Sequence, residues 1–251
     1  MIKAVFFDMG GTLEDIFSNE DNEKRTAREL YRILKKHGIE APFDEEALWV
    51  QVHPAILRYK AEAEVTLMEL KPEQIWPDYG FRGIPVDRDK LIAASEEIAH
   101  MWEVTYFDRS LRKNAEPALR GLKALGLYVA AVSNTASVFQ VFDTLKQYGV
   151  RQYFDGITLS SIVGYRKPHP NIFKIALCQA GFAPEECAFV GDTVSRDVVG
   201  PRKAGFGKIF KISSFLTPLK DTGTYEGYAP DHEVTDIYDV YTILKGERDV
   251  L

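Results

Sequence analysis

Short apolar runs along the chain, each ending abruptly in small or polar residues, predict the strands of a parallel sheet. They lie at 2–7, 127–133, 187–190 and, more weakly, 207–212. Because these runs lack the alternation of a half-exposed strand, we expect strands that are buried on both faces. Helical patterns lie between them, at 116–125, 138–147 and 171–180. Alternating strands and helices predict an α/β fold, a Rossmann-like three-layer core around a parallel sheet.

The stretch between the first two predicted strands is helical in character. It is rich in Glu, Lys, Ala and Leu, has almost no strand pattern, and is too long for an ordinary connection. Two apolar stripes predict helices, and Asp44 is a candidate N-cap for a third that Pro54 should kink or divide. The stripes comprise Ala27, Leu30, Tyr31 and Leu34, and Leu91, Ala94, Ile98, Met101 and Trp102. We therefore expect an α/β core domain of residues 1–15 and 108–251 and an inserted all-α domain of residues 16–107.

Composition and charge narrow the class of protein. The 251 residues are 45% apolar and carry a net charge of −6, which argues against a general binder of nucleic acid or anionic membranes. The two cysteines, Cys178 and Cys187, have no metal-ligand spacing and suggest no disulfide framework. We see no signal peptide and no run of ~18 apolar residues, so we expect a soluble cytoplasmic protein.

Polar residues follow the predicted strands at their carboxyl ends. Asp8 and Thr12 follow the first strand, Ser133 and Asn134 end the second, and Asp192 follows a later one. In open α/β sheets ligands bind at this edge. Two carboxylates there would repel each other without a counter-charge, and oxygen ligands beside a phosphate favour Mg²⁺. A loop at 164–170, stiffened by two prolines, supplies a lysine, Lys167.

Four separated motifs, in order along the chain, carry a resemblance to a known family. They are DMGGTL at 8–13, VSN at 132–134, KPHP at 167–170 and VGDTVSRD at 190–197. Together they resemble the haloacid dehalogenase superfamily of hydrolases, over roughly 1–15 and 108–240. The helical insertion resembles the cap domain of that family's commonest subclass, which implies that it closes over the core.

The resemblance implies a role for each motif residue. Asp8 would be the nucleophile, forming an aspartyl-phosphate or aspartyl-ester intermediate. Lys167 would neutralise developing charge and restrain Asp8. The phosphate-binding residues would be Gly11, Thr12, Ser133, Asn134 and Lys167. Mg²⁺ would be held by Asp8, the Gly10 carbonyl and Asp192, with Asp197 behind these ligands.

One position departs from the family pattern. The phosphatases of the family have Asp-x-Asp in the first motif, and here the second aspartate is Gly10. Glycine keeps the carbonyl that binds metal but removes the general acid/base, which is worth ~10²–10⁴ in rate. Glu14, Asp15 and His53 are candidate replacements, each interpreted more simply as a hinge or surface residue. Arg58 and Lys60 could meet an anionic substrate, although a solvated face is the simpler interpretation.

These residues leave several functions open. We favour a Mg²⁺-dependent phosphatase or phosphotransferase that acts through Asp8. The first alternative is a 2-haloacid dehalogenase, since those enzymes also lack the second aspartate, but they lack the Gly-Asp of the fourth motif as well. A weakly catalytic phosphate-binding protein is the second alternative. Phosphonate cleavage would need a cap lysine that forms a Schiff base, and Lys60 is only a nominal candidate for that lysine.

Overall fold

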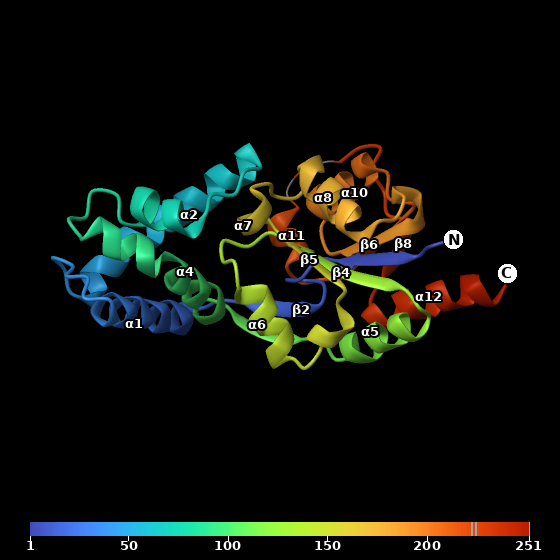
Figure 1. Ribbon diagram of the computed structural model, residues 1–251, viewed down its shortest axis with the longest axis horizontal. Helices are drawn as coiled ribbons and strands as arrows, with labels where there is room; N and C mark the ends of the chain where they lie inside the picture. Colours follow the sequence, from blue (N-terminus) through green and yellow to red (C-terminus); the bar gives the residue numbers. More distant parts are fainter. Residues whose placement is uncertain (222, 224, 251) are drawn as a thin grey trace.

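The computed structural model describes residues 1–221, 223 and 225–250. The molecule is elongated, with a sheet covered by helices at one end and a purely helical part at the other (Figure 1). In the described part of the chain, no helix has the length and apolar character needed to cross a membrane.

The main sheet is six-stranded and entirely parallel, in the order β5-β4-β1-β6-β7-β8. Its strands are β1 (Ala4–Phe7), β4 (Tyr128–Ser133), β5 (Gly156–Leu159), β6 (Cys187–Gly191), β7 (Lys208–Ile212) and β8 (His232–Val234). The four predicted strands are confirmed. The sequence reading missed β5 and β8, which have only four and three residues.

Helices cover both faces of this sheet, so the predicted three-layer α/β fold is confirmed. The side chains of β1 alternate between the layers. Val5 and Phe7 pack with α5 (Ala115–Ala124), α6 (Gln140–Gln147) and α12 (Ile237–Asp249). Phe6 packs on the opposite face with α8 (Pro170–Ala180), near α10 (Val199–Ala204). Shorter segments are α7 (Ser160–Val163), α9 (Val194–Asp197), α11 (Thr217–Lys220), η2 (Arg151–Tyr153) and η3 (Pro184–Glu186).

The helical part has an apolar core of its own. It consists of α1 (Glu20–Lys36), α2 (Glu45–Thr66), α3 (Pro72–Ile75), the π-helical turn η1 (Trp76–Gly80) and α4 (Arg88–Thr105). Leu30, Ile56 and Trp102 are among its buried residues. Asp44 caps α2 as predicted, accepting a hydrogen bond from the Ala47 amide at 2.9 Å. Of the two effects expected of Pro54, a kink or a division, the division does not occur, because α2 runs unbroken from Glu45 to Thr66.

Two short strands connect the helical part to the sheet. β2 (Glu14–Phe17) pairs antiparallel with β3 (Asp108–Leu111), so that Glu14 lies opposite Leu111 and Phe17 opposite Asp108. The sequence pattern predicted no strand in either segment. Both chain crossings thus run side by side in one small sheet (Figure 1).

Candidate active site

The register of the central strands gathers the motif residues at one edge. Phe7 pairs with Ala131 on β4 and with Val190 on β6. Asp8, the residue after β1, therefore lies at the same edge of the sheet as Ser133 at the end of β4 and Asp192 after β6. A cavity of about 240 Å³ opens here between the sheet and the helical part. It is lined by Asp8, Met9, Gly10, Ile16, Tyr59, Lys60, Glu64, Glu69, Glu103, Phe107, Arg109, Ser133, Asn134, Thr135, Ala136, Gln140, Arg166, Lys167 and Arg196.

A buried lysine joins two of the predicted carboxylates. Lys167 Nζ donates to Asp8 Oδ1 at 2.6 Å and to Asp197 Oδ1 at 2.7 Å. The Lys167 side chain is 2% exposed. Burial by itself favours the neutral amine, but the charges and hydrogen bonds of Asp197 and Asp8 outweigh it and raise the pKa of Lys167. Lys167 therefore carries a positive charge against the predicted nucleophile.

Asp197 is held equally firmly. It accepts hydrogen bonds from the hydroxyl of Thr193 at 2.6 Å and from the Thr193 amide at 3.2 Å. Burial opposes its charge, but Lys167, Arg196 and these hydrogen bonds lower the pKa of Asp197. Behind it, a Cβ on Gly191 would lie 2.2 Å from Asp197 Cβ, so that only glycine fits there. Asp197 is thus positioned as an ionised partner of Lys167.

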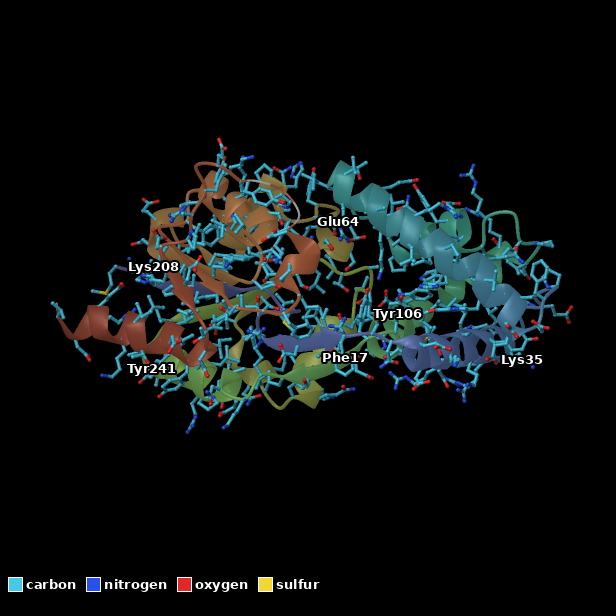
Figure 2. All side chains as sticks on the ribbon, turned by 180° about the vertical axis from the view of Figure 1, so that it is seen from behind. Phe17, Lys35, Glu64, Tyr106, Lys208 and Tyr241 are labelled. Carbon is cyan, nitrogen blue, oxygen red and sulfur yellow. The ribbon has the colours of Figure 1, made fainter. Side chains whose placement is uncertain are left out.

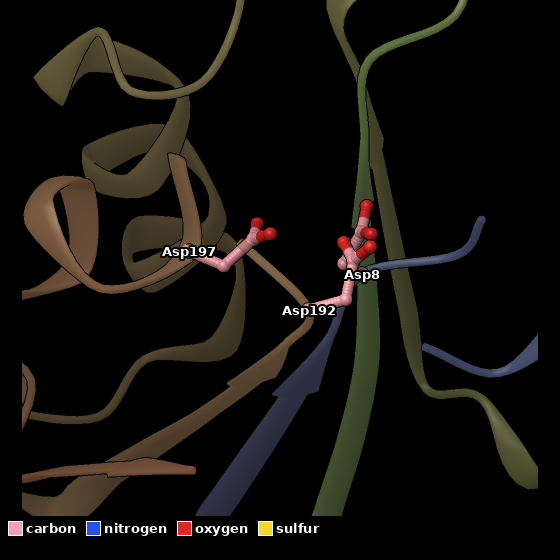
Figure 3. Close-up of side chains that lie close together, drawn as sticks. All are labelled: Asp8, Asp192 and Asp197. Carbon is pink, nitrogen blue, oxygen red and sulfur yellow. The ribbon is translucent and has the colours of Figure 1, made fainter. Parts of the chain in front are cut away.

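The donor set at the sheet edge fits a divalent cation. Asp8, Asp192 and Asp197 are buried and each offers a carboxylate oxygen within 4.8 Å of the others. Figure 3 shows Asp8 and Asp192 where neighbouring strands end, with Asp197 on the adjoining turn. Carboxylate and carbonyl oxygens are the ligands that suit Mg²⁺. Gly11 leaves room for Asp192, since a Cβ there would lie 2.2 Å from Asp192 Oδ2.

Hydrogen bonds from neighbouring loops fix the remaining motif residues. Thr12 is buried and donates to Asp8 Oδ2 at 3.3 Å. Asn134 binds the backbone of Lys167 twice, accepting from its amide at 2.7 Å and donating to its carbonyl at 3.1 Å. Ser133 is buried at the end of β4 and lines the cavity. The second motif therefore positions the lysine loop as well as lining the site.

Ile16 occupies the space beside Gly10. A Cβ built on Gly10 would lie 2.9 Å from Ile16 Cδ1. Both residues line the cavity, and Ile16 comes from the connecting strand β2. An aspartate at position 10 could enter only if Ile16 moved or became smaller. Where the family's second aspartate is missing, the apolar side chain of Ile16 on β2 thus fills the adjoining space.

The three residues considered as replacement acids lie outside the lining of this cavity. Glu14 is fully buried and accepts from Arg109 at 2.5 Å and from the Tyr148 hydroxyl at 2.8 Å. Asp15 pairs with Arg112 at 3.0 Å. His53 is hydrogen-bonded to the Tyr106 hydroxyl at 3.0 Å within the helical part. Each has a structural partner, in keeping with the simpler interpretation.

The helical part contributes groups that the sequence reading missed. Glu64, Glu69 and Glu103 reach the cavity from α2, the segment after it, and α4. Figure 2 shows Glu64 at the boundary between the two parts of the molecule. The cavity also receives cationic side chains that no motif role had identified, namely Arg109, Arg166 and Arg196. The available signal was the acidic character of 60–69, which contains Glu62, Glu64 and Glu69, but surface helices are often as acidic.

The prediction of a solvent-exposed position was wrong for one of the two cationic residues considered on α2. Lys60 lines the cavity and keeps 30% of its side chain exposed, so the expectation of a solvated face is wrong for it. Arg58 is exposed and lies outside this cavity. Two residues along α2 point in different directions because successive side chains are about 100° apart around a helix.

Known proteins are similar to this chain over most of its length. A family model described as haloacid dehalogenase-like hydrolase matches residues 2–205. A glyceraldehyde 3-phosphate phosphatase of Methanothermobacter thermautotrophicus is 33% identical over 229 residues, 86% of this chain and 88% of that protein. One of Methanopyrus kandleri is 28% identical over 206 residues, 82% of each.

Solved structures share the fold. A 2-haloacid dehalogenase from Pseudomonas syringae has a TM-score of 0.66 at 20% identity, covering 98% of this chain and all of that one. A HAD phosphatase from Thermococcus onnurineus has a TM-score of 0.57 at 21% identity, covering 98% and 99%. Their names give two different activities, so the shared fold does not choose between them.

Proposed function

The chain belongs to the haloacid dehalogenase-like hydrolase family, and we propose that this hydrolase is a Mg²⁺-dependent phosphatase acting through an aspartyl-phosphate at Asp8. The observation that carries the proposal is the arrangement around Asp8. Its carboxylate lies at the cavity with Lys167 at 2.6 Å and with Asp192 close enough to share a cation. The resemblance assigns that second carboxylate to metal binding, and 2-haloacid dehalogenases need no metal.

In the first step an oxygen of Asp8 attacks the phosphorus, and the bond to the ester oxygen breaks. Thr12 holds the other Asp8 oxygen, while Ser133 and Asn134 bind the phosphoryl oxygens. Lys167 balances the charge that develops between Asp8 and the phosphoryl group. In the second step water attacks the same phosphorus, releasing phosphate and restoring Asp8.

Mg²⁺ would be held by Asp8, the Gly10 carbonyl and Asp192. Bound there, the ion would neutralise the charge of the phosphoryl oxygens and the two carboxylates. Asp197 would contact Lys167 and Thr193 instead of the ion, because its oxygens already accept from both.

The substrate is a small phosphorylated metabolite. A cavity of about 240 Å³ has room for a phosphoryl group and a short carbon chain. Two relatives that cover most of the chain are named glyceraldehyde 3-phosphate phosphatases, which supports a substrate of that size and class.

The test is phosphate release from glyceraldehyde 3-phosphate and from an aryl phosphate, with Mg²⁺ or with EDTA. Asp8→Asn should lose turnover by ~10⁴ or more and keep its circular dichroism, because the amide is nearly isosteric but does not attack phosphorus. Asp15→Asn, a carboxylate outside the cavity, is the matched control. Full activity of purified Asp8→Asn would contradict the covalent mechanism.

Dehalogenation is the second candidate, favoured by the missing aspartate at Gly10. To test for dehalogenation, the same experiment also measures halide release from 2-chloropropionate. Halide release that is insensitive to EDTA, with no phosphate release from either ester, would replace the proposed phosphatase with a dehalogenase.

A further inference from the structure

Gly10 leaves the leaving group without the family's proton donor, so the proton must come from another group that lines the cavity. This step rests on the proposed phosphatase function. Attacking and leaving oxygens of phosphoryl transfer lie roughly in line with the phosphorus. Since Asp8 attacks from the sheet, the leaving oxygen faces the helical part. Residues of α2, α4 and the segment between them line that side of the cavity.

Most ionisable groups on the helical side of the cavity already form hydrogen bonds or ion pairs with neighbouring residues. Glu69 accepts from the Tyr59 hydroxyl at 2.5 Å, from Ser160 at 2.8 Å and from Arg166. Burial and the neighbouring Glu69 raise the pKa of Tyr59, which makes it a poor acid. These contacts leave Tyr59 and Glu69 no proton to give.

The other two carboxylates are held by arginines. Glu64 accepts from Arg166 at 2.5 Å, and Glu103 accepts from Arg109 at 2.9 Å. Both carboxylates are therefore engaged as hydrogen-bond acceptors of arginines, and neither is directed at the leaving group as a donor.

Lys60 differs from its neighbours. Among the described residues no hydrogen bond of its amine is found, and its near carboxylate, Glu103, is 4.0 Å away. Its Nζ lies 5.1 Å from the ring centre of Phe107 and 6.0 Å from those of Trp102 and Tyr106. The amine thus projects into the cavity from an aromatic wall, with protons available to a bound substrate.

The groups around Lys60 favour an amine that gives up its proton readily. Burial lowers the pKa of Lys60 below its usual range. Glu103 and Glu69 work against this shift, while Arg166 and Arg109 add to it. A donor whose pKa lies nearer neutrality transfers its proton more effectively at neutral pH.

We propose that Lys60 is the general acid/base of this phosphatase, taking over from the cap the role that position 10 lacks. As the bond between phosphorus and the ester oxygen breaks, the Lys60 ammonium donates a proton to that oxygen, and the alcohol leaves. The neutral amine then accepts a proton from the water that attacks phospho-Asp8. Phosphate leaves, Asp8 is regenerated, and Lys60 returns to its ammonium form.

The experiment compares an alkyl ester, glyceraldehyde 3-phosphate, with an aryl ester, p-nitrophenyl phosphate, whose leaving group needs no proton. Lys60→Met should lower kcat for the alkyl ester by ~10²–10⁴ and slow formation of phospho-Asp8 from the aryl ester only slightly. Lys60→Arg keeps the charge, and should keep KM while losing kcat for the alkyl ester. Arg58→Met, a cation on the same helix outside the cavity, should behave as wild type.

A pH profile adds a readout that a purely structural lysine would not move. The wild-type kcat for the alkyl ester should fall as the pH rises through the pKa of Lys60. In single-turnover phosphorylation by the aryl ester this limb should be absent. Equal losses on both esters in Lys60→Met, or no loss on either, would overturn the assignment. A wild type that hydrolyses only the aryl ester would also overturn it, leaving the phosphatase intact. If neither ester released phosphate, the proposed function itself would fail.

Discussion

At the residue scale, the four motifs were sufficient to predict which side chains meet. Asp8, Ser133 and Asp192 follow parallel strands whose ends share one sheet edge, so their proximity follows from the register. The buried pair of Lys167 with Asp8 was likewise expected from the resemblance. The contact between Ile16 and Gly10 was not predictable, because it depends on the path of β2 after the motif.

Gly10 gives a test of what this contact does. Gly10→Asp should increase the turnover of alkyl phosphates, at most by the ~10²–10⁴-fold that a well-placed acid/base supplies. The size of the increase should depend on how far the Ile16 side chain can move away. Gly10→Asp/Ile16→Val removes the Cδ1 atom that lies 2.9 Å from the new Cβ, and should gain more. Ile16→Val alone is the control and should cost about 0.5–1.5 kcal/mol of stability without raising activity. Steady-state kinetics in the wild-type and Lys60→Met backgrounds would measure the gain, which we expect to be larger in the latter. Equal gains for Gly10→Asp with and without the Ile16 change would contradict the role given to Ile16.

At the element scale, the long amphipathic patterns predicted helices well, and the short strands were missed. β5 and β8 are too short to form a pattern, while β2 and β3 carry charged residues and form a small sheet of their own. Pro54 does not divide α2. A proline removes one backbone hydrogen bond, but a helix that packs along its whole length can continue through it. Packing of Val52 and Ile56 on either side of Pro54 against the helical core keeps α2 continuous.

A second connection between the two parts could not be predicted at all. Residues after α2 pair with the loop that carries Lys167: Glu69 donates its amide to the Gly164 carbonyl at 3.0 Å, and the Arg166 amide donates to Leu67 at 2.9 Å. The side chains of Glu69 and Arg166 form a buried ion pair beside these bonds. Contacts between distant segments of loop leave no periodic signal in sequence.

We expect this connection to hold the helical part against the sheet. Glu69→Gln removes one of the two carboxylate charges beside Arg166; because Glu64 still pairs with Arg166, the cost should be below the ~3–5 kcal/mol of a buried charge left without any partner. The Glu69 and Arg166 amides should then exchange hydrogen faster than in wild type, because the backbone bonds at 164–166 open more often. Hydrogen exchange with mass spectrometry measures this, and Glu46→Gln on exposed α2 is the control. Unchanged exchange at 64–70 and 160–168 would show that the ion pair does not stabilise the closed arrangement.

At the scale of the whole molecule, two sets of apolar contacts organise the chain. The sheet and its helices bury Phe6 and Phe7, whereas the helical part buries Leu30, Ile56 and Trp102 in a separate cluster. We propose, from these clusters, the same division of residues 16–107 from the rest that the apolar stripes predicted. The active-site residues lie where the two parts meet, so motion about β2 and β3 would open and close the cavity.

We expect Mg²⁺ bound at the same meeting point to raise the stability of the whole molecule. Asp8, Asp192 and Asp197 are buried there, and each offers a carboxylate oxygen within 4.8 Å of the others. A cation that binds the folded chain alone stabilises it by about 2.7 kcal/mol at a hundred times its Kd, which for a chain of this size raises Tm by roughly 5–10 °C. Asp192→Asn should lose most of this increase, because the amide that replaces the carboxylate carries no charge to attract the cation. Thermal unfolding with Mg²⁺ and with EDTA measures the increase, and Asp249→Asn, which removes an exposed carboxylate on α12, controls for the loss of a charge. Equal Mg²⁺-dependent increases in wild type and Asp192→Asn would place the cation elsewhere and remove the basis for the proposed metal ligands.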